Sequence, residues 1–352
     1  MNAPHSPTAA PPEPRMETAE AAGYRDPGQW ARERTAIFAR SWQFLGHVSQ
    51  LPEPGSWIAE TLAGYPMVVV RDEAGALKGF HNVCRHRAGP LTLGSSGRCD
   101  GALVCRYHGW RYAYDGRLRL ARDFGPAADF DPRDFSLYPI QVETWRGLVF
   151  VCLDGARDPL ADWIAPLEAR LGGADWSGLK VGLVRAHPLA CNWKTYVENY
   201  LEGYHVPVLH PSLDAEIDSA RYRVSLDGRV ALHEAPLRKP DPVYGGLWAW
   251  LWPNLGVNVY GEDQGVMIER IAPMGHQATR LDYVYLTPGG KPVGPETLEM
   301  SDAVLAEDLG IVEQVQANLD AGVYRTGRLS PRHEQAVAAF QEFVAEALTS
   351  EG

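Results

Sequence analysis

Two pairs of cysteine and histidine residues stand in the first third of the sequence. Cys84 and His86 are separated by one residue, Cys105 and His108 by two, and eighteen residues lie between the pairs. Two thiolates and two imidazoles on two loops can hold either a tetrahedral zinc ion or an iron–sulfur cluster. Core cysteines and surface histidines are the alternative interpretation.

The spacing of these four residues separates the two kinds of metal site. Zinc knuckles usually contain Cys-x-x-Cys pairs, whereas Cys-x-His with Cys-x-x-His is the pattern of Rieske [2Fe–2S] centres. The segments 84–91 (CRHRAGPL) and 105–112 (CRYHGWRY) closely resemble the cluster loops of Rieske oxygenase catalytic subunits. The stretch between the loops is slightly longer than usual, and we place the extra residue in the polar turn 94–100. Cys99 lies there without a suitably spaced histidine, so we expect a plain thiol.

A second group of candidate ligands lies in the segment 191–211. We expect a helix over 191–205 with Glu202 and His205 on its polar face. Pro207 stands between His205 and His210, so we expect the chain to leave the helix there and both imidazoles to converge from a helix end and the following turn. A solvated polar face is the alternative.

Two histidines and one carboxylate form the facial triad of non-haem Fe(II) oxygenases. The helix expected over 296–321 offers Asp308 as the carboxylate, on a face shared with Val304, Ile311, Val312 and Val315. An unpaired carboxylate on an apolar face is costly to bury, and coordination removes that cost. The neighbouring Glu307 is the alternative ligand.

The run 192–210 resembles the mononuclear-iron motif of Rieske non-haem iron oxygenase catalytic subunits, and Asp308 matches the third ligand of that family. With both metal motifs present in this order, the resemblance covers about residues 30–345. It implies a [2Fe–2S] cluster, a mononuclear Fe(II) and O2 as co-substrate. The implied ligands are Cys84, His86, Cys105 and His108 for the cluster, and His205, His210 and Asp308 for the iron.

In this family an acidic residue three positions before the first iron-binding histidine links the two metal sites across a subunit boundary, and here that residue is Glu202. The carboxylate is expected to accept N–H groups from His108 and from His205, which fixes both rings. Many members carry Asp there, and Glu indicates the branch that acts on betaines, carnitine and choline. A head-to-tail homotrimer follows by the same analogy.

Aromatic residues of the second half could form a cage for a quaternary ammonium, which accepts no hydrogen bond and is recognised by cation–π attraction. The tryptophans of the alternating segment 247–252 share one face, as do two tyrosines of 282–286. Packing in the core is the alternative, and a flat aromatic substrate would fit the same rings. The expected pocket residues are Trp248, Trp250, Tyr260, Tyr283 and Tyr285.

The pattern of elements predicts an α+β protein: an N-terminal all-β Rieske domain followed by an antiparallel sheet gripped by helices. We expect a disordered tail at 1–14, a helical lead-in at 15–42 that packs on the catalytic domain, the Rieske domain at 43–155 and the catalytic domain at 156–352. Expected helices are 30–42, 159–171, 191–205 and 296–321; expected strands are 56–62, 67–71, 79–83, 102–104, 111–114 and 147–153, with β-rich runs between 181 and 287.

Composition excludes several other classes. The chain has 352 residues, 45% of them hydrophobic, and a net charge of −11, so a nucleic-acid or anionic-membrane partner is not expected. We find neither an apolar run of membrane-spanning length nor a secretory signal, and expect a cytoplasmic protein. Five scattered cysteines in a chain of this size favour reduced thiols over a disulfide framework.

These features predict a terminal oxygenase that hydroxylates a small molecule, with oxidative N-demethylation of a quaternary ammonium compound such as a betaine as the favoured reaction. Ring hydroxylation of an aromatic acid is the alternative within this chemistry, and a Rieske electron-transfer protein is the alternative from another class. The sequence lacks a Gly-rich dinucleotide fingerprint after a strand. We therefore expect a separate flavin or iron–sulfur reductase to supply electrons from NAD(P)H.

Overall fold

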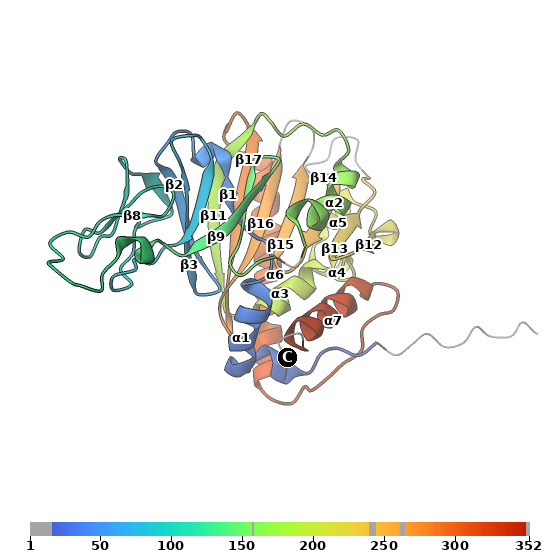
Figure 1. Ribbon diagram of the computed structural model, residues 1–352. Coiled ribbons are helices and arrows are strands. Elements are labelled where there is room, and N and C mark those ends of the chain that lie inside the picture. The colour runs from blue at the N-terminus through green and yellow to red at the C-terminus, as the bar shows by residue number, and fades with distance from the viewer. Residues whose placement is uncertain (1–15, 157, 239–243, 261–264, 350–352) are drawn as a thin grey trace, which may run out of the picture.

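A computed structural model describes residues 16–156, 158–238, 244–260 and 265–349. The predicted tail 1–14 lies outside these residues. The predicted α+β fold is confirmed: a β-rich N-terminal part is followed by a large antiparallel sheet with helices (Figure 1). No helix of the described residues is long and apolar enough to cross a membrane.

The N-terminal part contains ten strands arranged in two antiparallel sheets. The larger sheet has the order β1-β10-β9-β4-β3-β2-β5, and the smaller has the order β6-β7-β8. The predicted polar turn 94–100 contains β5, which pairs with β2. The strands are β1 (Gln43–His47), β2 (Ser56–Leu62), β3 (Tyr65–Arg71), β4 (Leu77–His81), β5 (Ser96–Arg98), β6 (Leu103–Val104), β7 (Arg111–Tyr112), β8 (Leu118–Leu120), β9 (Pro139–Trp145) and β10 (Leu148–Cys152).

The second half is built on a seven-stranded antiparallel sheet of order β11-β17-β16-β15-β14-β13-β12. Residues alternate between its faces, as the sequence of β14 predicts. Trp248, Trp250 and Trp252 pack toward helices α3, α6 and α7, whereas Ala249 and Leu251 pack toward α2. The strands are β11 (Leu179–Leu189), β12 (Arg223–Asp227), β13 (Val230–Glu234), β14 (Tyr244–Leu251), β15 (Leu255–Tyr260), β16 (Val266–Gly275) and β17 (Ala278–Pro288).

The helices differ from the expected ones mainly at their ends. The lead-in helix was expected over 30–42, but α1 begins after its N-cap Asp26 and a π-helical turn ends at Phe38. The helix expected over 191–205 ends at Tyr200. The α-helices are α1 (Pro27–Glu33), α2 (Leu160–Leu171), α3 (Trp193–Tyr200), α4 (Val206–Leu209), α5 (Pro211–Glu216), α6 (Pro295–Asp320) and α7 (Gln335–Thr349).

The lead-in contacts the catalytic half through a buried ion pair. Glu33 at the end of α1 is fully buried, and its carboxylate accepts hydrogen bonds from Lys194 Nζ at 2.5 Å and from Trp193 Nε1 at 2.9 Å. Both partners begin α3. A buried carboxylate is tolerated here because a cation and a second donor satisfy it.

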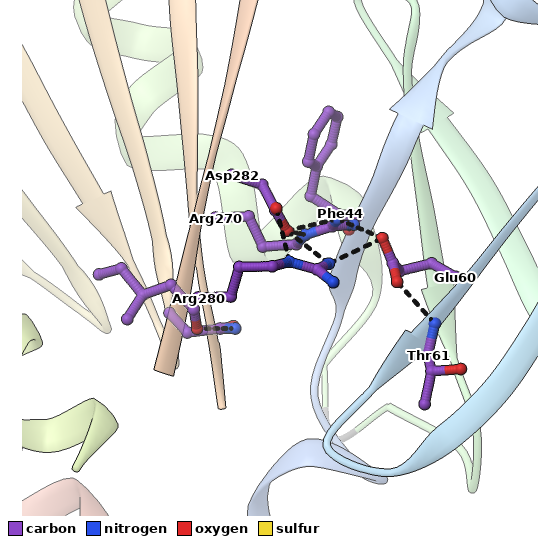
Figure 2. Close-up of polar contacts among 8 residues, drawn as sticks. Phe44, Glu60, Thr61, Arg270, Arg280 and Asp282 are labelled. Atoms are coloured by element: carbon purple, nitrogen blue, oxygen red, sulfur yellow. Dashed lines mark hydrogen bonds and ion pairs between the residues drawn. The ribbon is translucent and has the colours of Figure 1, made fainter. Parts of the chain in front are cut away.

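A second charge network joins the N-terminal part, called the cluster half because it carries the predicted cluster loops, to the seven-stranded sheet of the second half, called the catalytic sheet (Figure 2). Arg270 of β16 donates to Asp282 of β17 at 2.7 Å and, across the domain boundary, to Glu60 of β2 at 2.9 Å. Arg280 contacts the same two carboxylates, and Arg270 Nη1 donates to the carbonyl of Phe44 in β1. Two cations and two carboxylates therefore hold the N-terminal strands against the seven-stranded sheet.

Candidate active site

The two predicted cluster loops lie against each other at one end of the cluster half. Each loop is closed by a turn: the amide of Ala88 donates to the carbonyl of Cys84, and the amide of Gly109 to that of Cys105. Gly109 takes a φ of 71°, which favours glycine. A backbone hydrogen bond from Arg106 to Pro90 ties the loops together. The fold thus places the four predicted cluster ligands on adjacent turns.

The side chains of this site fit a cluster. Cys84 and Cys105 are buried, and the rings of His86 and His108 lie 4.6 Å apart. The Nδ1 atom of His86 is buried and finds no hydrogen-bond partner in the described part of the chain. Such an atom is costly unless a metal takes its lone pair. Two thiols and two imidazoles are also the donor set that Rieske centres require.

Two neighbours complete the surroundings of the cluster loops. Tyr112 Oη lies 3.1 Å from Cys84 Sγ, and the ring of Trp110 stacks on His86 with centroids 4.9 Å apart. Cys99 is placed elsewhere, as its lack of a histidine partner predicts: its thiol donates to the carbonyl of Gly55 at 3.4 Å. None of the five cysteines forms a disulfide.

The second predicted site brings His205, His210 and Asp308 together from different elements. Asp308 Oδ1 lies 3.1 Å from His210 Nε2 and 3.9 Å from His205 Nε2. One donor atom of each residue lies within 4.8 Å of the other two. His210 and Asp308 are buried and His205 is partly buried. Two imidazoles and one carboxylate on one side of a common point are the donor set of a non-haem Fe(II) centre.

Each imidazole of this group has a carboxylate on its other nitrogen. Glu202 Oε1 lies 2.5 Å from His205 Nδ1, and Glu307 Oε2 lies 2.7 Å from His210 Nδ1. When Nδ1–H donates to a carboxylate, Nε2 keeps its lone pair for a metal and the ring orientation is fixed. Glu307, the alternative ligand of the sequence analysis, therefore faces the nitrogen of His210 that points away from Asp308.

The path of the chain that brings the two histidines together differs from the predicted one. Helix α3 ends at Tyr200, so Glu202 lies in the turn that follows, where its carboxylate accepts the backbone N–H groups of Tyr204 and His205. Pro207 does not end a helix; it lies in the first turn of α4, and Pro211 begins α5. Proline is accepted there because the first N–H groups of a helix have no intrahelical partner. His205 and His210 thus cap consecutive short helices.

The burial of α6 also differs in detail from the prediction. Ile311 and Val315 were expected to share the buried face of Asp308, but both are more than 40% exposed. The buried stripe runs through positions spaced three or four residues apart, so it includes Asp308 and Val312. Asn199 of α3 donates to Asp308 Oδ1 at 2.8 Å and holds this carboxylate toward the histidines.

A cavity of about 110 Å³ opens beside Asp308, between α3, α6 and the catalytic sheet. Three of the five predicted pocket aromatics line it: Trp248, Tyr260 and Tyr283. The prediction is wrong for Trp250 and Tyr285, which do not line this cavity.

Helices cover the two aromatics that do not reach the cavity. Trp250 is fully buried and packs against Phe340 of α7 at 5.6 Å between ring centroids. The hydroxyl of Tyr285 is bonded to Ser301 of α6 at 2.8 Å. The faces of the strands were predicted correctly, but the helix that covers each ring is set by tertiary packing.

A buried polar group in the wall of this cavity was not predicted from the sequence. Glu269 of β16 is 3% exposed, and burial raises the pKa of its carboxyl to about 7. Tyr196 Oη donates to it at 2.7 Å, and Asn258 Nδ2 lies 3.4 Å away. The signal was present in the sequence as a glutamate within the apolar run 266–272.

A buried histidine, also missed, lines the same cavity. His233 of β13 is 1% exposed, and burial lowers its pKa to about 3, so the ring is neutral. Its Nδ1 lies 2.8 Å from Tyr222 Oη, and its Nε2 has no hydrogen-bond partner among the residues that the structure describes. Such an atom is available to a bound molecule.

Comparison with known proteins finds a matching family model for each half of the chain. Residues 41–131 match the family model of the Rieske [2Fe–2S] domain, and residues 176–350 match that of the ring hydroxylating alpha subunit (catalytic domain). The two matches correspond to the two sites described above.

Relatives are similar over nearly the whole chain. The chloroplastic choline monooxygenase of Beta vulgaris is 30% identical, with 96% of this chain and 78% of the relative covered. The carnitine monooxygenase oxygenase subunit of Acinetobacter pittii (strain PHEA-2) is 29% identical, with 89% and 90% covered. The crystal structure of CntA, a quaternary ammonium Rieske monooxygenase in complex with an inhibitor, has a TM-score of 0.85 at 28% identity, with 95% of this chain and 96% of that chain covered.

Proposed function

Because the chain belongs to the Rieske non-haem iron oxygenases, as a catalytic subunit, we propose that it hydroxylates an N-methyl group of a quaternary ammonium compound. This family uses a [2Fe–2S] cluster, a mononuclear iron and O2. The relatives named above are choline and carnitine monooxygenases, which supports the substrate class.

The observation that carries the proposal is the meeting of a metal-type donor set with an aromatic cavity. Asp308, His205 and His210 form one wall, and the rings of Trp248 and Tyr260 line the same space. A quaternary ammonium offers no hydrogen bonds, so aromatic faces are its natural contacts. Iron at this wall would activate O2 next to a methyl group that the rings hold.

The size of the cavity supports a small substrate. Its volume is about 110 Å³, and an engineered apolar cavity of about 150 Å³ in another protein holds benzene. A Rieske electron carrier would need neither the cavity nor the second donor set.

The reaction balances with electrons from outside the chain. One O2, two electrons and two protons convert R–N⁺(CH3)3 into R–N⁺(CH3)2CH2OH and water. The carbinolamine then loses its hydroxyl proton and the C–N bond breaks, with the electron pair staying on nitrogen, to give formaldehyde and the tertiary amine. A separate reductase would supply the electrons from NAD(P)H, which agrees with a cytoplasmic location.

We assign the metal ligands as the sequence and geometry suggest. Cys84, Cys105, His86 and His108 would hold the cluster, and the domain limits 43–155 and 156–352 would each enclose one metal site. The orphaned Nδ1 of His86 supports the first set. The 3.1 and 3.9 Å separations of Asp308 from the histidines support the second, His205, His210 and Asp308.

Electron transfer between the sites is proposed to cross a subunit boundary. Strand β8, next to the cluster loops, and helix α4, which follows His205, lie on opposite sides of the chain (Figure 1). Glu202 already contacts His205, and the adjoining Tyr204 and Val208 are 58% and 87% exposed. A head-to-tail homotrimer would bring another subunit's His108 to this surface. The study of CntA names inter-subunit electron transfer in that protein.

The test is a turnover assay with a reductant, a surrogate reductase and a panel of betaines, carnitine, choline and aromatic acids. We expect formaldehyde to equal the ammonium compound consumed, and Asp308→Ala to abolish it while the cluster is still reduced. A ring-hydroxylated acid as the product would favour the alternative oxygenase. Cluster reduction without substrate-coupled O2 uptake in any reaction would favour an electron-transfer protein.

A further inference from the structure

Apart from the two histidines of the metal-type donor set, the titratable side chains of the active-site cavity that carry a charge are acidic. Glu202, Glu269 and Asp308 line it, and no lysine or arginine of the described residues does. The one buried histidine of the sheet wall, His233, is neutral because burial lowers its pKa to about 3. Outside the metal-type donor set, the described part of the cavity wall thus has acidic side chains to offer a ligand but no cationic one.

The three carboxylates differ in the groups that can neutralise their negative charge. Asp308 belongs to the metal-type donor set, and Glu202 is bonded to His205 of that set. A divalent iron there would balance both. Glu269 lies outside this group: its hydrogen-bond partners are the neutral side chains of Tyr196, Tyr283 and Asn258.

A buried carboxylate without a cation is costly even when it accepts hydrogen bonds. Two other deeply buried carboxylates are neutralised by a cationic side chain: Glu33 pairs with Lys194, and Asp282 pairs with Arg270. Glu269 has no such partner among the described residues, and it faces a cavity. A ligand that brings its own positive charge supplies the missing partner.

We propose, building on the proposed function, that Glu269 is the counter-ion of the substrate's ammonium group and that the substrate is a cation without a carboxylate. An amino alcohol such as choline fits this description. A zwitterion such as glycine betaine or carnitine would bring a carboxylate into a cavity whose charged walls repel it. An aromatic acid would meet the same repulsion.

The buried imidazole of His233 is suited to a hydrogen bond with a hydroxyl group of the substrate. His233 Nε2 has no partner among the described residues, and a neutral imidazole nitrogen either donates to a hydroxyl oxygen or accepts its proton, depending on the tautomer. A carboxylate can only accept, so it would pair with one of the two tautomers, whereas a hydroxyl pairs with either. The cavity therefore has a carboxylate for the ammonium and a neutral imidazole for a hydroxyl.

The test compares equilibrium binding of four probes to the iron-loaded enzyme: choline, glycine betaine, L-carnitine and 3,3-dimethylbutan-1-ol, the uncharged isostere of choline. We expect the wild type to bind choline about 10- to 100-fold more tightly than the isostere, as for a desolvated charge contact. Both zwitterions should bind at least about tenfold more weakly than choline. This comparison needs no variant.

The isosteric substitution Glu269→Gln should remove most of the preference for choline over the isostere and leave binding of the isostere itself within a few fold. Met267→Leu, a volume-conserving change in the same wall, should keep the preference. Cluster absorbance and iron content report whether each variant is folded.

Three outcomes would overturn the inference. Equal binding of choline and a zwitterion by the wild type would contradict the argument from charge. A preference for choline over the isostere that survives in folded Glu269→Gln would show that Glu269 is not the counter-ion. Both leave the proposed function intact if formaldehyde is still released from an ammonium compound. Absence of binding and turnover for every ammonium compound would overturn both.

Discussion

Glu307 and Asp308 are adjacent acidic residues with different expected roles, and paired substitutions separate them. Asp308 Oδ1 faces the Nε2 atoms of both histidines, whereas Glu307 contacts Nδ1 of His210 at 2.7 Å. Asp308→Ala removes one of three proposed ligands. Glu307→Ala removes only the group that orients one of the remaining two.

The expected magnitudes follow from the surroundings of each carboxylate. Loss of a residue that orients a metal ligand typically weakens metal binding by about 10- to 100-fold. The Glu307 side chain is 33% exposed, so water can replace it. We therefore expect about tenfold weaker iron binding in Glu307→Ala, or about 1.4 kcal/mol. For Asp308→Ala, whose side chain is 9% exposed, we expect a loss greater than about 100-fold, beyond the range of an orienting group.

The assay is an anaerobic titration of Fe(II) into protein that retains its cluster, followed by turnover at saturating iron. Turnover of Glu307→Ala should recover at high iron, because the three ligands remain, and that of Asp308→Ala should not. The cluster spectrum is the control for folding. Full turnover in Asp308→Ala together with irreversible loss in Glu307→Ala would show that the carboxylate ligand has been misassigned.

Three further predictions concern the electron path, the cluster and acid stability. Glu202→Gln should keep both metals but lose most single-turnover oxidation of the prereduced cluster, and a wild-type rate at full iron loading would contradict the bridge. Tyr112→Phe removes the hydroxyl 3.1 Å from Cys84 Sγ and should lower the cluster potential by about 40 mV, the one-electron equivalent of a hydrogen bond of about 1 kcal/mol; an unchanged redox titration would refute this. Burial lowers the pKa of His47 to about 4 and that of His233 to about 3, so between these values and 6.5 the unfolded chain binds more protons. The stability contributed by these two histidines should therefore fall as pH decreases from 7 toward 4, whereas Glu269, whose pKa is raised to about 7, contributes in the opposite sense. In urea titrations His47→Gln should accordingly lose less free energy of unfolding than the wild type between pH 7 and pH 4.

The sequence was sufficient for residues whose role depends on local pattern. The Cys-x-His and Cys-x-x-His motifs can be recognised from spacing alone, and in the structure the turns at Ala88 and Gly109 close the two loops that carry them. The alternation of 247–252 likewise fixed which face each tryptophan takes. Period and spacing are properties of the backbone, so they can be predicted without knowledge of tertiary contacts.

Contacts between distant segments could not be predicted from local sequence patterns. Nothing in the sequence indicates that α7 covers Trp250 while Trp248, on the same face of β14, reaches the cavity. The role of Glu307 depends on the placement of α5 against α6, and the role of Glu269 depends on what faces it from α3. These relations are set by packing, which overrides local preference.

The same packing bears on how the two metal sites can cooperate. Arg270 and Arg280 of the catalytic sheet hold Glu60 of the cluster half at 2.9 Å (Figure 2). The Arg270 and Glu60 side chains are 7% and 21% exposed, and Asp282 would still pair with both arginines, so loss of the Glu60 contact is expected to cost about 1.5–3 kcal/mol, as for a hydrogen bond to a charged group. A swing of the cluster domain toward the iron site of its own chain would break that contact. A rigid domain boundary with the proposed metal sites on opposite sides therefore favours an electron route through a second subunit, and Glu202, beside an exposed surface, is placed to receive it.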